Sequence, residues 1–441
     1  MKTRFLMSLL LAFFVSCSSD DSTPTGTNTN QNGEENSSSS KNEDSSKSGD
    51  SEGKSGSKES AMKGTLNFPS NKSTSAVDKM YNNWIDRYYV TFNEEIKPED
   101  YDYLNENKLE WLKVSGRIKF DTPSQTVSEG IGYGMLLTVF QEDQKRFDAL
   151  MNYYLAWRVS VKSESYFMNW KIDGFQSVKG QGSATDADID IVAALLVAYE
   201  KWGDKKYKQY ALENASSIYR DEVWSSTKLL IPGDGGLFGT GNVYNISYFS
   251  LAALRLLAEY DDNKDHKWKD VLEASIEYMQ KVQKAGNGLW PDWSDADGKP
   301  TDAGNGATTT RDGAYKYFGL EGVRIPFRLV WDYLWFGDDR VKSMIKTAAE
   351  FIYKQVDGNI DKVKSTYIYQ GTDTETHGVG GIGFKSAFCS LLMIDSKYAS
   401  NLSACNTTVL EKALPNDTKY FQPSLQMLYA MLLNGKIARY K

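Results

Sequence analysis

The chain has 441 residues, a net charge of −7 and a pI near 5.2. This acidic balance argues against nucleic acid as a partner, because binding to phosphates requires a basic face. The composition includes 58 acidic residues but only two histidines, so acid–base chemistry has to fall to carboxylates.

The first 17 residues have the features of an export signal. Lys2 and Arg4 precede an apolar run from Phe5 to Val15, which is too short to span a bilayer and is typical of a signal peptide. The run leads into Cys17 in a sequence that resembles a bacterial lipobox, although Phe14 replaces the usual Leu or Val. We therefore expect residues 1–17 to be a lipoprotein-type signal peptide, with a plain secretory peptide as the alternative.

Residues 18–61 form the next segment. Between Ser18 and Ser60 there is no aliphatic or aromatic residue, so this stretch cannot bury enough apolar surface to fold and is expected to be a disordered tether. The pair Asp20-Asp21 resembles the surface-export signals of lipoproteins. We expect an outer-membrane or cell-surface lipoprotein that contacts the membrane only through a lipid on Cys17. A secreted or periplasmic protein is the alternative.

Residues 62–441 are expected to form one domain, because no second low-complexity break occurs. Segments in which apolar residues recur with the period of an α-helix are separated by Gly, Asp and Asn residues. Examples are residues 146–159, 189–202, 206–219, 247–260, 268–282, 324–335, 341–353, 385–394 and 423–433. Strand-like alternation is scarce, and 366–370 is the best example. The pattern predicts an all-α fold. Cys389 and Cys405 can pair in an oxidising compartment, but the sequence leaves the pairing open.

The first chemistry-bearing stretch surrounds Glu129. Gly130, Gly132 and Gly134 leave little side-chain bulk beside it, so a ligand can approach closely. A carboxyl group that is buried there would have the raised pKa that a general acid requires. The alternative is that Glu129 only stabilises the start of a helix through the helix dipole.

The second stretch contains Asp186, Asp188 and Asp190 at the start of an apolar helix. Asp186 and Asp190 can share a helix face, whereas Asp188 points elsewhere. All three can instead serve as caps and dipole partners. The spacing lacks the Gly and the closing Glu of a calcium loop.

The third stretch runs from Tyr315 to Arg328, and in it Glu321 and Arg324 are spaced to form an ion pair at the head of a helix. Aromatic residues are frequent in the loops, and aromatic rings can stack on sugar rings. The loop aromatics are Trp170, Phe238, Trp290, Trp293, Tyr315 and Tyr317. Paired carboxylates with aromatic surroundings are typical of the active sites of glycoside hydrolases.

Together these segments resemble glycoside hydrolase family 8, and the resemblance covers about residue 77 to the C-terminus. The segment 128–134 matches the family's general-acid motif, with Glu129 in the place of the acid. The segment 184–191 matches the family signature, with Asp186 in the place of the aspartate that holds the sugar at the cleavage subsite. Val192 stands where Ala is usual. The segments 168–173, 245–249 and 289–293 resemble further parts of the family's cleft.

One departure concerns the general base. Typical members with an aspartate base have Tyr-Asp-Ala-x-Arg, whereas this chain has Leu320-Glu321-Gly322-Val323-Arg324, so Glu321 falls on the base. Glutamate is longer by one methylene group. Asp312, and more remotely Asp292 and Asp295, are the alternatives, because some members take the base from a loop before this helix.

The resemblance implies a monomeric (α/α)6 barrel that needs no metal and no cofactor. It also implies an inverting, endo-acting enzyme on β-1,4-linked polysaccharide, either xylan or β-glucan and cellulose. Glu129 would be the acid, Glu321 the base, and Asp186 the residue that holds the distorted sugar. The expected substrate-binding residues are Trp170, Tyr248, Arg324, Tyr133 and Trp293.

Two alternatives remain at this point. A chitosanase would suit the acidic run that contains Asp292, Asp295, Asp297 and Asp302, which is also typical of an ordinary solvated loop. A surface glycan-binding lipoprotein without catalysis would suit the departure at Glu321. The sequence does not choose between xylan and glucan, or between endo and exo action.

Overall fold

The computed structural model describes residues 62–92, 106–158, 165–302, 316–368, 376–413 and 419–439. The expected signal peptide (1–17), the expected tether (18–61) and the alternative base Asp312 lie outside these ranges. Helices dominate the described residues, as the sequence predicted. None of those helices combines the length and the apolar composition that a membrane span requires.

Among the described residues, six helices form an inner wall and close into a ring. In that ring each helix packs against the next, and the last returns to the first. They are α3 (Ser128–Gln141), α5 (Thr185–Trp202), α7 (Leu251–Tyr260), α9 (Ile325–Phe336), α11 (Ile382–Leu392) and α13 (Phe421–Leu433). Most of their residues are buried, because they face either the barrel interior or an outer helix. This burial explains why their sequences are almost continuously apolar.

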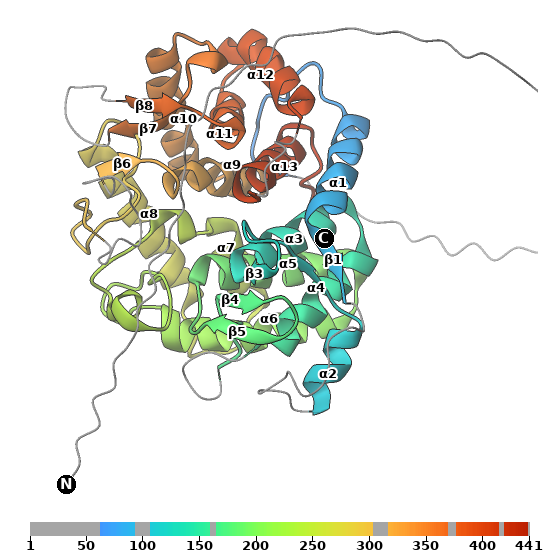
Figure 1. Cartoon of the computed structure of the whole chain (residues 1–441). Helices are drawn as coiled ribbons and strands as arrows, with labels where there is room; N and C mark the ends of the chain where they lie inside the picture. The colour runs from blue at the N-terminus through green and yellow to red at the C-terminus, as the bar shows by residue number, and fades with distance from the viewer. Residues whose placement is uncertain are drawn as a thin grey trace, which may run out of the picture.

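Six further helices cover the ring from outside. Five of them pack on the inner helix that precedes them in the chain, and α1 packs on α13. These outer helices are α1 (Thr74–Tyr88), α4 (Gln144–Ala156), α6 (Lys205–Ser217), α8 (Trp268–Ala285), α10 (Asp339–Val356) and α12 (Ala399–Glu411). The alternation of inner and outer helices confirms the (α/α)6 barrel. Figure 1 shows α9 to α13 in orange and red above α3 to α7 in teal and green.

A further α-helix of the described part of the chain, α2 (Glu106–Lys113), packs on α4. Between the helices, the described residues form three small antiparallel sheets. Their strands are β1 (Tyr89–Thr91) and β2 (Gly116–Ile118), then β3 (Gln125–Val127), β4 (Lys171–Asp173) and β5 (Ser177–Gly180), and finally β6 (Tyr317–Phe318), β7 (Lys364–Ile368) and β8 (Thr376–Val379). Strand β7 confirms the expectation at 366–370 as far as Ile368, whereas the other strands were not expected.

One expected helix begins later than its pattern suggested. The segment 247–260 is α-helical only from Leu251, because residues Ile246–Tyr248 form a 3-10 turn. The side chain of Asn245 accepts a hydrogen bond from the amide of Ser247 and caps that turn. Phe249 then leaves the helical region, with φ −77° and ψ 79°. The turn carries Tyr248, so this break belongs to the site described below.

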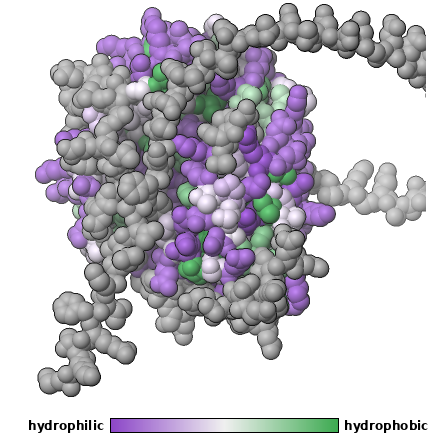
Figure 2. All heavy atoms as spheres, viewed as in Figure 1, coloured by the Kyte–Doolittle hydropathy of each residue, from purple (hydrophilic) through white to green (hydrophobic). Residues whose placement is uncertain are grey.

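The sequence left open whether the two cysteines of the helical domain pair, and the structure shows that they do. Cys389 in α11 and Cys405 in α12 form a disulfide between an inner and an outer helix. The viewed face of the protein is mainly hydrophilic where described residues are visible, with scattered apolar side chains (Figure 2).

Candidate active site

The candidate site is built from the starts of inner helices. Glu129 lies in the first turn of α3 and Asp186 in the first turn of α5. Arg324 closes the 3-10 turn Gly322–Arg324 that leads into α9, and Tyr420 directly precedes α13. The positive end of a helix dipole favours a carboxylate, so the positions of Glu129 and Asp186 suit acidic side chains that must be held without full solvation.

Arg324 connects the three carboxylates predicted from the sequence. Its Nη1 donates hydrogen bonds to Glu129 Oε2 at 2.6 Å and to Asp186 Oδ2 at 2.7 Å, while Nη2 donates to Glu321 Oε2. The arginine side chain is only 5% exposed. The structure therefore brings Glu129, Asp186 and Glu321 around one buried guanidinium group. It also confirms that Glu321 and Arg324 pair.

Glu129 is held by two hydroxyl groups as well as by Arg324. Tyr420 donates to Oε1, and the hydroxyl of Tyr133 lies 3.3 Å from Oε2. Burial raises the pKa of Glu129 to about 7; Arg324 lowers it, and the charge of Asp186 raises it. Desolvation prevails because the charged form loses more hydration than its partners restore. Glu129 thus retains a proton well above the usual range of a carboxyl group.

Glu321 is held from a second side by Asn245, whose Nδ2 donates to Oε2 at 2.7 Å. The alternative bases Asp292 and Asp295 have other partners. Asp292 Oδ1 accepts the amides of Gly319 and Gly322, and Asp295 Oδ1 accepts the amides of Asp297 and Lys299. Each of these aspartates therefore binds the backbone of a loop.

The acidic residues of α5 point in two directions, as their spacing predicted. Asp186 faces Arg324, and one turn later Asp190 pairs with Arg328, with Oδ2 at 2.9 Å from Nη2. Because both pairs are spaced by four residues, two successive ion pairs join α5 to the turn before α9 and to α9 itself.

Asp188 points away from that face into a second group of buried carboxyls. Burial, followed by the charges of Glu222 and Asp234, raises the pKa of Asp188 well above its usual range. Glu222 Oε1 accepts a hydrogen bond from Ser183 Oγ at 2.6 Å, and Asp234 Oδ1 accepts the amide of Ser183 at 2.7 Å. These contacts hold the segment that leads to Asp186.

The expected aromatic residues occupy several places around the site. The guanidinium carbon of Arg324 lies 5.1 Å from the ring centre of Tyr248. Trp293 packs edge-on against Tyr248 at 6.4 Å and stacks on Phe238 at 5.4 Å. Trp293 is 3% exposed, and Phe238 stacks on one face of its ring.

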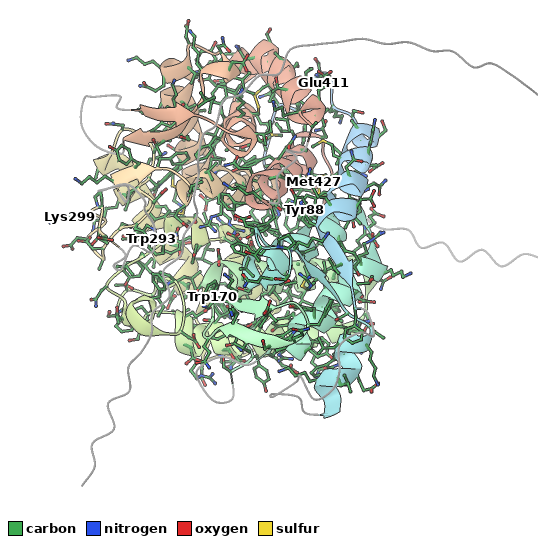
Figure 3. The ribbon with its side chains drawn as sticks, viewed as in Figure 1. Tyr88, Trp170, Trp293, Lys299, Glu411 and Met427 are labelled. Atoms are coloured by element: carbon green, nitrogen blue, oxygen red, sulfur yellow. A yellow bond between two sulfur atoms is a disulfide. The ribbon has the colours of Figure 1, made fainter. Side chains whose placement is uncertain are left out.

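Trp170 fixes the start of α3 through its backbone. Its carbonyl oxygen accepts the amide of Ser128, the residue before Glu129, at 2.9 Å. The half-buried indole ring lies against Gly180 in β5, where an added Cβ atom would come within 2.3 Å of it. Figure 3 shows Trp170 beside this sheet and Trp293 in the segment after α8.

Comparison with known proteins adds an independent observation. A family model described as Glycosyl hydrolases family 8 matches residues 100–436. The chain belongs to glycosyl hydrolase family 8. The match includes every carboxylate bound by Arg324.

Named relatives of this family 8 chain include Endoglucanase 2 of Ruminiclostridium josui, which is 32% identical over 320 residues. That alignment covers 71% of this chain and 64% of the relative, so this chain matches less than two-thirds of it. The Beta-glucanase of Niallia circulans is 30% identical over 349 residues, which cover 74% of this chain and 82% of that protein. The apo structure of a beta-1,3-1,4-glucanase from Paenibacillus sp. X4 superposes with a TM-score of 0.72 and 25% identity, and the match covers 85% of this chain and 97% of that one.

Two residues that contact the proposed catalytic carboxylates of this family 8 chain were not predicted from its sequence. Tyr420 bonds to Glu129 from a position 291 residues later, and no local motif marks it. Asn245 lies in a segment expected to line the cleft, but its bond to Glu321 spans 76 residues and could be found only in three dimensions. Within the described ranges no group of His, Cys, Asp or Glu is arranged to hold a metal ion.

Proposed function

We propose that the chain is an inverting, endo-acting glycoside hydrolase that cleaves β-1,4-linked polysaccharide. The observation that carries this proposal is the pair of carboxylates on one guanidinium group. Glu129 and Glu321 bind adjacent nitrogens of Arg324, and burial raises the pKa of Glu129 to about 7. Such a pair provides the acid and the base that glycoside hydrolysis requires.

Glu129 is the general acid in this proposal. It gives its proton to the glycosidic oxygen as the bond from that oxygen to the anomeric carbon breaks. A pKa near 7 keeps the proton in place at mildly acidic pH and still allows its transfer. Arg324 and Tyr420 keep the carboxyl group in one orientation.

Glu321 is the general base. It takes a proton from a water molecule whose oxygen bonds to the anomeric carbon on the face opposite the departing oxygen. The configuration at that carbon is therefore inverted, and each cleavage consumes one water. Inverting enzymes separate their two carboxyl groups by roughly 6.5–9.5 Å to admit this water. The bond from Asn245 to Glu321 supports a fixed position for the base.

Asp186 binds hydroxyl groups of the sugar at the cleavage point and stabilises the positive charge that develops on the ring. Its pairing with Arg324 limits its movement. Tyr248, whose ring lies under Arg324, helps to place the attacking water. Tyr133, Trp170 and Arg324 shape the surrounding surface.

Trp293 is better suited to support the wall of the cleft from behind. Its ring is buried between Tyr248 and Phe238, which leaves Phe238 as the outer layer of this stack. An aromatic residue that is packed from below loses little conformational freedom when a sugar ring stacks on it.

The substrate class follows from the relatives' names. The named relatives are an endoglucanase and a beta-glucanase, and the solved structure is a beta-1,3-1,4-glucanase. These names support a β-linked glucan as substrate, and xylan remains the second member of the proposed class.

The proposal is tested with the full-length chain and its Glu129→Gln variant on xylan, carboxymethyl cellulose, mixed-linkage β-glucan and chitosan, with products identified by mass. We expect the parent alone to release oligosaccharides of several lengths from glucan or xylan. Hydrolysis of chitosan alone would instead identify a chitosanase. Retention of a polymer by both proteins without cleavage would identify a binding protein.

We also propose that the protein is an exported lipoprotein held at the cell surface by Cys17 and the tether 18–61. The disulfide between Cys389 and Cys405 supports export, because structural disulfides persist in oxidising compartments. Membrane fractionation of the parent and a Cys17→Ala variant tests this proposal. The parent should sediment with membranes and the variant should not. Equal distributions would contradict it.

A further inference from the structure

We propose that Asp292 is a positioning residue that fixes the backbone on either side of Glu321. This inference rests on the proposed role of Glu321 as the general base. It assigns a function to an acidic residue that the sequence offered only as an alternative base or as part of an acidic loop.

The contacts of Asp292 bracket Glu321. A single oxygen, Oδ1, accepts the amide of Gly319 at 2.7 Å and the amide of Gly322 at 2.8 Å. The amide of Glu321 also acts on this carboxyl group and lowers its pKa. Three amides within four consecutive residues therefore converge on one side chain, which is the arrangement of an anion-binding backbone nest.

Asp292 is itself held in place. Its own amide donates to the carbonyl oxygen of Tyr317 in β6 at 2.8 Å, so both its backbone and its side chain bind the segment that carries Glu321. The residue is 8% exposed. A buried acceptor that satisfies several amides is costly to remove, because those amides would lose their partner without gaining water.

The hydrogen bonds from Asp292 to the backbone around Glu321 form a clamp, and the glycines of this segment allow its close contacts. A Cβ atom on residue 319 would lie 2.8 Å from Asp292 Oδ2, and a Cβ atom on residue 322 would lie 2.6 Å from the ring of Phe318. The segment therefore approaches Asp292 and Phe318 more closely than residues with side chains allow. Glu321 is the residue in this tight turn whose side chain reaches Arg324.

The protonation state of Asp292 offers a way to distinguish a positioning role from a role as general base. Burial and the charge of Glu321 raise the pKa of Asp292 to about 7, so part of the population carries a neutral carboxyl group at neutral pH. A neutral group can still accept amide hydrogen bonds through its carbonyl oxygen. Asparagine should therefore replace Asp292 in a positioning role, whereas it could not replace a general base.

The test measures kcat and KM of the full-length chain with Asp292→Ala and Asp292→Asn on the polymer that the parent cleaves. Asp295→Ala is the matched control, because Asp295 also accepts two backbone amides but holds only its own turn. Misplacing a catalytic group by about 1 Å can cost about 10²-fold in rate. We expect kcat of Asp292→Ala to fall by about 10- to 100-fold with KM nearly unchanged.

The conservative variant decides between the roles. Asp292→Asn should keep a kcat within about threefold of the parent, since it retains the acceptor, and Asp295→Ala should match the parent. Equal loss in Asp292→Asn and Asp292→Ala would show that the ionisable group is essential and would overturn the positioning role. Full activity of a folded Asp292→Ala would overturn it as well.

Two further measurements keep the result decisive. If Asp292→Ala does not fold, Gly319→Ala perturbs the clamp from the opposite side, because its Cβ atom presses on Asp292 Oδ2. It should lower kcat with little change in KM, and an unchanged kcat would contradict the clamp. Glu321→Gln is assayed in parallel. An active Glu321→Gln would remove the proposed base and the positioning role together, whereas an inactive Glu321→Gln beside an active Asp292→Ala would remove only the latter.

Discussion

Arg324 Nη1 lies 2.6 Å from Glu129 Oε2, although 195 residues separate the two in the sequence. An ion pair of this kind favours the charged carboxylate and would by itself lower the pKa of Glu129. Burial has the larger effect, and the pKa rises to about 7. The arginine can thus orient the proposed acid without removing its proton at mildly acidic pH.

The first prediction is a loss of activity above neutral pH. Glu129 must be protonated to act as the acid, and its pKa is about 7. We expect kcat/KM to fall as the pH rises through about 7, because that ratio reports the ionisation of groups in the free enzyme. This fall is the alkaline limb of the pH–rate profile, and initial rates between pH 5 and 9 on the cleaved polymer measure it. A constant kcat/KM up to pH 9 would argue against Glu129.

The second prediction concerns Tyr420, whose hydroxyl group donates to Glu129 and lowers its pKa. In Tyr420→Phe this bond to the charged form is absent, so the pKa of Glu129 should rise and the alkaline limb should move to higher pH. Tyr154→Phe is the control, since that hydroxyl donates to the carbonyl oxygen of Tyr166. The limb should stay in place in the control. A shift to lower pH in Tyr420→Phe would contradict the assignment.

The third prediction concerns stability at alkaline pH. Burial, followed by the charges of Asp234 and Asp221, raises the pKa of Glu222 from 4.5 to about 8, although bonds from Ser183 and Thr185 lower it. The folded protein therefore holds a proton that the unfolded chain releases above 4.5. This stabilising contribution is full below pH 4.5 and is lost as the pH rises towards 8.

Glu222→Gln cannot ionise and should lessen the fall in unfolding free energy between pH 5 and 8. A single group contributes at most about 1.4 kcal/mol per pH unit in this window. Chemical denaturation at several pH values measures the slope. Glu411→Gln, at the exposed end of α12, should keep the parental slope. Identical slopes in the parent and Glu222→Gln would refute the prediction.

The fourth prediction concerns the buried pair of Asp190 and Arg328, both 2% exposed in their side chains. Asp190→Ala leaves the arginine charge buried without this partner, which typically costs about 3–5 kcal/mol. Denaturation of the variant measures the loss. The exposed pair of Arg340 and Glu273 offers a comparison, because Glu273→Gln should cost no more than about 1 kcal/mol. Comparable losses in both variants would contradict the prediction.

The sequence predicted the carboxylates of the site but not the way they are held. Glu129, Asp186 and Glu321 lie in local motifs, and the four-residue spacing of Asp186 and Asp190 already indicated a shared face. The contact of Arg324 with all three carboxylates depends on the closure of the ring. That closure brings together helix starts from distant parts of the chain, and no local pattern encodes it.

The sequence predicted the fold class better than the positions and the order of the helices. The helical period indicated inner helices such as α5 and α9 and outer helices such as α6 and α10. None of the periodic segments covered α1, α3 or α12, and the period gave no order around the ring. It also extended one helix back to residue 247, because the capping side chain of Asn245 and the turn at Phe249 do not alter the apolar period. The sequence indicated Trp293 as a substrate-binding residue, but only the packed structure shows that its ring stacks on Phe238.

The proposed reaction is an inverting hydrolysis with Glu129 as the acid. Its most direct test is proton NMR of the anomeric signals during the first minutes of polymer cleavage by the full-length chain, before the new reducing ends equilibrate. The proposal predicts that α-anomers appear first from a β-linked polymer and that Glu129→Gln releases neither anomer. Initial release of β-anomers, or cleavage by Glu129→Gln at more than about a tenth of the parental rate, would contradict it, since general acid catalysis contributes about 10²–10⁴-fold.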